Sequence, residues 1–363
     1  MKILGIETKY TIPNEEKIRT SAVDWWRVIN PLNNLKKITD WQIDIQKGVI
    51  NNKKPTQREV DEAWLKLGEY DIVFSSYYHN PIAYSYMAVI SKRTGMKYVY
   101  DLDDGLFMVK PYNPVYETVV KEKYNYETIL KDVSYLTTTN SRLKKEFKKI
   151  NEKGNIFVLP NFIDDEVYIP ANGHIEDNII TIAYQGGTSH VGDLLFTEFH
   201  SALAYILGKY QGKVRFQIFG FLPTELDSLP YVEHIEGKSD FYDWIEIYKK
   251  YSPFWDIGVA PLEENDFNIY KSPIKVMEYG ISQVPTIASP VGPYLSIIKD
   301  KKNGYFAKTV KDWINCFEDL IENREKRLKM GEIIKQEVLK DWTIKSKIHL
   351  WKEVFEKIYY DKR

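Results

Sequence analysis

The sequence predicts an α/β protein whose two halves are each a doubly wound parallel sheet. Its 363 residues exceed what one hydrophobic core usually supports, which favours two domains. Short apolar runs rich in Val, Ile, Tyr and Phe alternate with longer segments of helical period, a pattern typical of a parallel sheet covered by helices on both faces. This alternation begins a second time after a polar stretch at residues 164–178, so the two halves are expected to share one architecture.

In the first half, short apolar runs mark the expected strands. They lie at residues 2–7, 41–46, 71–77, 97–102, 134–139 and 156–161. Helical segments are expected at residues 55–70, 80–95 and 140–154. Asn80 and Asn140 are suited to cap the starts of the last two, while Gly95 and Gly154 are suited to end them.

In the second half, the expected strands lie at residues 179–187, 213–220, 232–237, 255–262, 284–289 and 304–308. We place the domains at residues 1–170 and 171–341, joined by the polar stretch. The final segment, residues 342–363, has apolar side chains at helical spacing, which predicts a long terminal helix. Its apolar positions are Ile348, Trp351, Val354, Phe355 and Ile358.

The composition excludes several classes of protein. The 50 basic residues nearly balance the 51 acidic ones, so no overall charge draws the chain to nucleic acid or to an anionic membrane, although a local basic patch is compatible with this total. The single cysteine, Cys316, excludes an intramolecular disulfide and is expected to be a buried helical thiol. With no signal-like start and no long apolar stretch, the protein is expected to be soluble and cytoplasmic.

The segment KSPIKVMEYG, residues 271–280, carries the strongest chemical signal. Ser272 and Pro273 are suited to start a helix, whose free amides and positive dipole end stabilise an anion. Lys271 and Lys275 oppose that dipole, and a bound phosphate would explain them. Glu278 lies about one turn deeper, where it could accept hydrogen bonds from ribose hydroxyls. The alternative is a solvated Lys–Glu pair on an exposed helix.

The segment IAYQGGTSHVGDL, residues 182–194, follows an expected strand directly. Gly186 and Gly187 allow the backbone to approach a ligand, and Thr188 offers a hydroxyl. His190 lies at the start of the next helix. The segment matches neither the dinucleotide-binding fingerprint nor the P-loop, and a tight turn with a helix cap is the alternative.

Three carboxylates follow the strand in KYVYDLDDGLF, residues 97–107. Asp101, Asp103 and Asp104 could bind a metal, act as a base or contact sugar hydroxyls. No other group of carboxylates or histidines has recognisable ligand spacing, which argues against a metal. A polar turn with an Asx cap is the alternative.

The order of these motifs resembles that of the retaining, family-4-type glycosyltransferases with the GT-B fold. The segments that carry the resemblance are KYVYDLDDGLF, SYLTTTNSRLKKEF, IFVLPNFID, IAYQGGTSHVGDL, KSPIKVMEYGISQVPTIASPVGPY and KKNGYFA, which extend from residue 97 to residue 307. In that fold two Rossmann-like domains face each other across a cleft, with the acceptor on the first and the nucleotide sugar on the second. The resemblance also implies that the terminal helix, residues 342–363, packs back onto the first domain.

The resemblance implies transfer of a sugar from a nucleotide sugar, such as a UDP- or GDP-sugar, to an acceptor hydroxyl. Retention of anomeric configuration is expected, with no required metal and no cofactor. The expected catalytic residues are Asp103, Asp104 and His190, and the expected acceptor-side residues are Asp101 and Arg19. The expected donor-binding residues are Gly186, Gly187, Thr188, Lys271, Ser272, Lys275 and Glu278.

The chain departs from the family pattern at two places. The family usually has two glutamates eight positions apart at this helix; Glu278 matches the second, but Tyr270 occupies the first, as in a subset with a KSxxK variant. The usual glycine-rich loop after the first strand is absent.

The acceptor is expected to be a surface or lipid-linked saccharide, or else a modified base in viral DNA, with host cytoplasm as the location in that case. The functional alternatives are a sugar-nucleotide epimerase of the same fold and a noncatalytic nucleotide-sugar binding protein.

Overall fold

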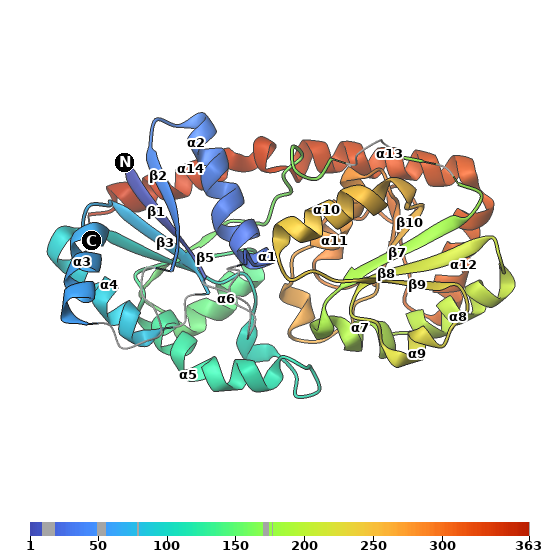
Figure 1. Ribbon diagram of the computed structural model, residues 1–363, viewed down its shortest axis with the longest axis horizontal. Helices are drawn as coiled ribbons and strands as arrows, with labels where there is room; N and C mark the ends of the chain where they lie inside the picture. The colour runs from blue at the N-terminus through green and yellow to red at the C-terminus, as the bar shows by residue number, and fades with distance from the viewer. Residues whose placement is uncertain (9–18, 49–55, 78–79, 170–173, 176, 363) are drawn as a thin grey trace.

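The computed structural model describes residues 1–8, 19–48, 56–77, 80–169, 174–175 and 177–362. Two α/β domains lie side by side, and two consecutive helices at the C-terminal end of the chain run along both of them (Figure 1). The predicted domain boundary between residues 170 and 171 falls outside the described residues.

The first domain contains a six-stranded parallel sheet in the order β2-β1-β3-β4-β5-β6. Its strands are β1 (Lys2–Glu7), β2 (Gln42–Lys47), β3 (Ile72–Ser76), β4 (Lys97–Asp101), β5 (Tyr135–Thr138) and β6 (Asn155–Val158). Each strand overlaps one of the apolar runs, so the predicted α/β class is confirmed for this half. The core strand β3 is buried along its whole length, as parallel strands covered on both faces are.

The second domain repeats this architecture with a six-stranded parallel sheet in the order β12-β11-β10-β7-β8-β9. Its strands are β7 (Ile180–Gly186), β8 (Val214–Gly220), β9 (Val232–Glu236), β10 (Ile257–Ala260), β11 (Thr286–Ala288) and β12 (Gly304–Phe306). The second set of apolar runs therefore also forms one sheet, as the sequence predicted.

The helices of the first domain are α1 (Ala22–Asp24), a π-helical turn (Trp25–Ile29), α2 (Asn30–Ile38), α3 (Gln57–Leu67), α4 (Pro81–Thr94), α5 (Tyr116–Asp132) and α6 (Ser141–Ile150). Those of the second are α7 (Val191–Leu195), α8 (Phe199–Lys209), α9 (Thr224–Asp227), α10 (Phe241–Tyr251), α11 (Ile274–Ile281), α12 (Val310–Glu322) and α13 (Arg324–Asp341). Asn80 and Asn140 cap α4 and α6 through their side chains, and Gly95 ends α4 with a φ of 81°. These three local signals act as the sequence indicated.

The last helix, α14 (Ile344–Tyr360), packs on the first domain, where its apolar side chains join a core formed by α2 and the first sheet. The ring of Trp351 meets that of Phe74 edge to face, with 5.8 Å between centroids. In contrast, α13 packs on α11 of the second domain (Figure 1). The chain crosses between domains twice, and the two crossings are joined by hydrogen bonds between Ile163 and the backbone of Trp342 and Ile344.

The domains also share a hydrophobic contact. Trp25 of the first domain stacks on Phe241 of the second, with 4.2 Å between ring centroids, and both belong to one continuous cluster of buried side chains.

Cys316 is half-buried on α12, and burial raises the pKa of its thiol to about 12. The thiol is therefore protonated at neutral pH, which fits the packing role expected for it.

Candidate active site

A cavity of about 680 Å³ opens between the two domains. It lies at the carboxyl ends of strands from both sheets, where ligands bind in open parallel-sheet folds. Most of the residues singled out by the sequence line it: Asp103, Asp104, Gly186, Gly187, Thr188, His190, Lys271, Ser272, Lys275 and Glu278. Asp101 and Arg19 are not among the lining residues.

The start of α11 faces this cavity without a side-chain cap. The helix begins at Ile274, and its N-cap residue Pro273 offers no side-chain acceptor to the first amides. Ser272 was expected to cap the helix, and this is wrong: its hydroxyl instead lies 3.2 Å from Asn161 Nδ2 of the first domain. A helix N-terminus whose amides lack a side-chain acceptor binds anions through those amides and the helix dipole.

Two lysines stand at this helix end. Lys271 Nζ lies 4.8 Å from the ring centroid of Phe267, and Lys275 Nζ lies 5.8 Å from that of Tyr184. Burial, together with the charge of Lys271, lowers the pKa of Lys275 to about 8. In the described part of the chain neither ammonium forms a salt bridge, and the carboxylates of Asp193 and Glu278 act on Lys275 only from a longer distance.

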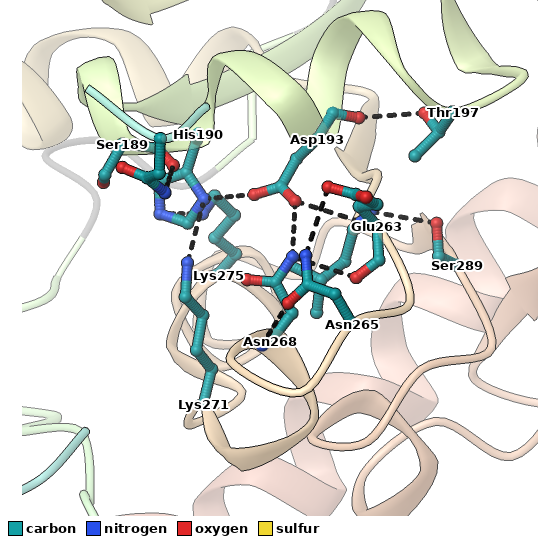
Figure 2. A network of polar contacts seen from close by, with 12 residues as sticks. Ser189, His190, Asp193, Thr197, Glu263, Asn265, Asn268, Lys271, Lys275 and Ser289 are labelled. Atoms are coloured by element: carbon teal, nitrogen blue, oxygen red, sulfur yellow. Dashed lines mark hydrogen bonds and ion pairs between the residues drawn. The ribbon is translucent and has the colours of Figure 1, made fainter. Parts of the chain in front are cut away.

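His190 lies between these lysines and a buried carboxylate (Figure 2). Its Nδ1 is 2.6 Å from Asp193 Oδ2, and its Nε2 is 3.2 Å from Lys275 Nζ. Burial and the two nearby lysines lower the pKa of His190 to about 3, so the ring is neutral at physiological pH. The shorter contacts assign the tautomer: Nδ1 carries the hydrogen and donates to Asp193, Nε2 accepts from Lys275, and Lys271 Nζ, 3.5 Å from Nδ1, is a neighbouring charge and not a donor to the ring.

Glu278 is only 4% exposed, although its carboxylate borders the cavity. Gln185 Nε2 donates a hydrogen bond to it. Burial raises the pKa of Glu278 to about 7, and the nearby Lys275 opposes that shift. The alternative of a solvated pair on an exposed helix is therefore wrong, because Glu278 is buried inside the cleft.

Glycines bring three neighbouring strand ends of the second domain close to the cavity. Gly186 ends β7 beside Gly220, which ends β8 with a φ of 104°. A Cβ at Gly220 would lie 2.3 Å from the carbonyl oxygen of Gly186, and a Cβ at Gly237 would lie 2.7 Å from the Cα of Gly220. The sequence analysis singled out Gly186 and Gly187 but missed Gly220 and Gly237, although both also follow apolar runs.

On the first-domain wall, Asp101 does not face the cavity. The carboxylate is fully buried and accepts two hydrogen bonds from the guanidinium of Arg27, at 2.9 Å from Nε and 2.7 Å from Nη2. Ser76 and Thr137 donate to the same carboxylate. The expectation that Asp101 contacts an acceptor is therefore wrong, because all its accepting positions are used inside the domain.

Asp103 and Asp104 border the cavity and are half-buried. The backbone amide of Asp104 donates to the hydroxyl of Tyr77, at 3.1 Å. Burial and the adjacent Asp104 raise the pKa of Asp103 to about 7, whereas burial raises the pKa of Asp104 against the opposing charge of Lys271. Tyr77 has a φ of 52°, a strained value for a tyrosine, and such strain concentrates at functional sites.

Arg19 connects the two domains. Its Nη1 donates to Ser239 Oγ at 2.5 Å, and Ser239 borders the cavity on the second-domain side. The next residue, Thr20, donates its amide to Asp240 Oδ2 at 3.0 Å. The proposed contact of Arg19 with an acceptor stays a prediction.

Within the described ranges, no group of three or more His, Cys, Asp or Glu side chains could hold a metal ion. The expectation that no metal is required stays a prediction. Across the same ranges, none of the helices combines the length and apolar character needed to cross a membrane.

Comparison with known proteins gives one family and several similar structures. Residues 271–337, which include α11 and its lysines, match the family described as glycosyl transferases group 1. No curated protein matches the sequence significantly. Among solved structures, a glycosyltransferase from Rickettsia africae is 14% identical, with 99% of each chain covered and a TM-score of 0.65.

Two further structures extend this similarity. HepE from Anabaena, in complex with UDP and glucose, is 12% identical over 99% of each chain, with a TM-score of 0.62. Sucrose-phosphate synthase from Thermosynechococcus elongatus is 10% identical over 99% of each chain, with a TM-score of 0.63. At these identities the similarity to solved structures establishes the fold alone, and the family match is confined to the region around α11. The chain therefore has the GT-B fold of these glycosyltransferases, and its residues 271–337 match one glycosyl transferase family.

Proposed function

We propose that the protein transfers a sugar from a nucleotide-sugar donor to an acceptor hydroxyl, with retention of anomeric configuration. The observation that carries this proposal is the start of α11, where Lys271 and Lys275 lie beside a helix N-terminus without a side-chain cap. Neither lysine has a carboxylate partner in the described part of the chain. A diphosphate would supply the missing negative charge to both lysines and accept hydrogen bonds from the amides.

The nucleoside would lie deeper along α11. Glu278 is one turn beyond Lys275 and borders the cavity, so its carboxylate can accept hydrogen bonds from both ribose hydroxyls. Gly186, Gly187 and Thr188 line the same cavity, and the two glycines allow the backbone to approach the phosphates. UDP is the first nucleotide to test, because the similar HepE structure holds UDP and glucose.

Catalysis in this proposal is mainly electrostatic. As the glycosidic bond breaks, negative charge grows on the departing nucleoside diphosphate, and the fixed cations at α11 stabilise it without a metal ion. The sugar would then lie toward the first-domain wall, where Asp103 and Asp104 face the same cavity. We assign His190 to the donor-phosphate side, because its ring contacts both lysines.

The acceptor that we propose is a surface or lipid-linked saccharide, and the reaction is placed in the cytoplasm. A modified base in DNA is the alternative. The nearly balanced charge, 50 basic against 51 acidic residues, favours the saccharide, since DNA binding depends on neutralising many phosphates with basic side chains.

One observation keeps a noncatalytic binding protein as the second candidate. Tyr270 stands where the family usually has its first glutamate, and its ring packs against the core of the first domain. Its carbonyl oxygen accepts a hydrogen bond from Asn140 Nδ2, at 2.7 Å. The position therefore serves an interdomain contact in this chain.

Incubation with radiolabelled UDP- and GDP-sugars separates the candidates. A transferase slowly hydrolyses its donor when no acceptor is present, an epimerase converts the donor, and a binding protein leaves it unchanged. We expect hydrolysis of one donor by the wild type and loss of that hydrolysis in Lys275→Ala. Binding without any turnover, even when candidate saccharide acceptors are added, would favour the noncatalytic protein.

A further inference from the structure

Asp193 is the centre of the polar network shown in Figure 2. Its carboxylate is 3% exposed and accepts three hydrogen bonds from different elements. His190 Nδ1 lies 2.6 Å from Oδ2, while the Glu263 amide at 3.0 Å and Asn268 Nδ2 at 2.8 Å donate to Oδ1. A carboxylate held by donors on both oxygens has a fixed orientation, so its contact with His190 is also fixed.

The contact determines which nitrogen of His190 can accept a hydrogen bond. An ionised carboxylate only accepts, so Nδ1 must carry the hydrogen and Nε2 must present its lone pair. Burial opposes ionisation of Asp193, but the hydrogen bond from His190 and the charge of Lys271 lower its pKa below the usual value. The lone pair of Nε2 points to Lys275 Nζ, 3.2 Å away.

We propose that Asp193 is a positioning residue for the donor: by fixing the tautomer of His190, it makes Nε2 hold the Lys275 ammonium at the start of α11. This inference rests on the proposed function, because the ammonium is held for the donor diphosphate. Lys275 forms no salt bridge in the described ranges, so the imidazole supplies the hydrogen bond that orients its flexible side chain.

The variant Asp193→Asn tests whether Asp193 fixes the tautomer of His190, because it replaces the carboxylate by an amide of nearly the same size and shape. The Glu263 amide and Asn268 Nδ2 both donate toward the same oxygen, so an asparagine must keep its carbonyl oxygen there and turn its NH₂ toward His190. His190 must then accept at Nδ1 and carry its hydrogen on Nε2. Nε2–H and the ammonium of Lys275 would face each other as two donors.

The matched control is Thr197→Val. Thr197 Oγ1 donates to the backbone carbonyl of Asp193, at 2.8 Å, and does not touch the carboxylate. A local structural disturbance around Asp193 would therefore affect both variants, whereas loss of tautomer control would affect only Asp193→Asn.

The first measurement is ¹⁵N NMR of histidine-labelled protein without ligand, with His190 assigned from His190→Ala. We expect the Nδ1–H tautomer in the wild type and in Thr197→Val, and the Nε2–H tautomer in Asp193→Asn. An Nε2–H tautomer in the wild type would overturn the inference, even if Asp193→Asn did not fold.

The second measurement is a double-mutant cycle on UDP affinity by titration calorimetry. We expect Asp193→Asn to weaken UDP binding about tenfold in the wild type and to have no further effect in His190→Ala, because the two residues act as one unit. An equal loss in both backgrounds would show that Asp193 acts by another route. A wild type that has the expected tautomer but binds no UDP or GDP would instead contradict the proposed function.

Discussion

Two buried carboxylates, one on each side of the cleft, have opposite environments. Asp101 of the first domain is surrounded by donors, including the bidentate guanidinium of Arg27. Glu278 of the second domain has only neutral donors, the side chains of Tyr168, Trp244 and Gln185, and forms no salt bridge in the described part of the chain; burial raises its pKa to about 7. A carboxylate paired with a buried cation inside the domain maintains the fold, whereas one without a cationic partner at the edge of a cavity is a candidate ligand contact.

Two cations, the buried Arg27 and the half-buried Lys275, show the same contrast. Arg27 donates to Asp101, to the carbonyl oxygen of Leu159 and to Asn161 Oδ1. Lys275 has the neutral ring of His190 as its hydrogen-bond partner and borders the cavity. Arg27 is therefore fully used inside the first domain, whereas the half-buried Lys275 borders the cavity and is available to an added anion.

The largest expected effect is on stability, from Arg27→Ala. Removal of the guanidinium leaves Asp101 charged and buried, which costs on the order of 3–5 kcal/mol in free energy of unfolding. Urea denaturation measures the change. Lys37→Ala, which removes the exposed pair with Glu166, is the control and should change the free energy of unfolding far less, because solvent screens that pair. Equal small losses in both variants would show that the Arg27–Asp101 pair does not support the fold.

The next largest effect is expected on turnover, from a change at Asp103, which borders the cavity, whereas Asp101 does not. We expect Asp103→Asn to lower turnover about ten- to a hundredfold while changing donor affinity little, because Asp103 faces the cavity opposite the lysines. Steady-state kinetics and calorimetry measure the two quantities. Asp104→Asn is the companion variant. Normal turnover in both, or a loss of stability alone, would favour the polar-turn interpretation.

A smaller effect is expected from Glu278→Gln on stability. Burial raises the pKa of Glu278 from 4.5 to about 7, so the folded protein favours the protonated form, and its stability falls as pH rises from about 4.5 through 7. Glutamine mimics the protonated form. The variant should therefore be more stable than the wild type at pH 8, by about 1–2 kcal/mol, and similar to it at pH 4.5.

Urea denaturation of Glu278→Gln and wild type at the two pH values measures this difference. UDP affinity should fall at the same time, since the ribose loses a charged acceptor. A stability difference that is the same at both pH values would mean that the ionisation of Glu278 is not the cause.

The sequence could predict both sheets because parallel strands that are covered on both faces are continuous apolar runs. Most of the site residues that it singled out line the cavity, since the carboxyl ends of these strands meet at one edge of each sheet. The segment at residues 22–38 was missed: all residues of its π-helical turn, Trp25–Ile29, are buried, so it lacks a clear amphipathic pattern.

Tertiary partners account for the errors at the site. Asp101 and Asp103 have similar sequence surroundings, but only Asp101 meets Arg27, which is 74 positions away along the chain. Serine is a common N-cap residue, yet in this structure Pro273 occupies the N-cap position of α11. Asn161 of the other domain donates a hydrogen bond to the hydroxyl of Ser272. The spacing of three residues between His190 and Asp193 indicated that their side chains could meet. The sequence could not show that Glu263 and Asn268 orient the Asp193 carboxylate, or that His190 contacts Lys275.

The central claim is that the start of α11 binds the donor diphosphate. Titration calorimetry of wild type and Lys275→Ala with UDP and UMP tests it most directly, because the two ligands differ by the phosphate that would bear the sugar. We predict that the variant loses about tenfold in affinity for UDP and clearly less for UMP. Unchanged affinity for both nucleotides would contradict the assignment of this helix end as the donor site.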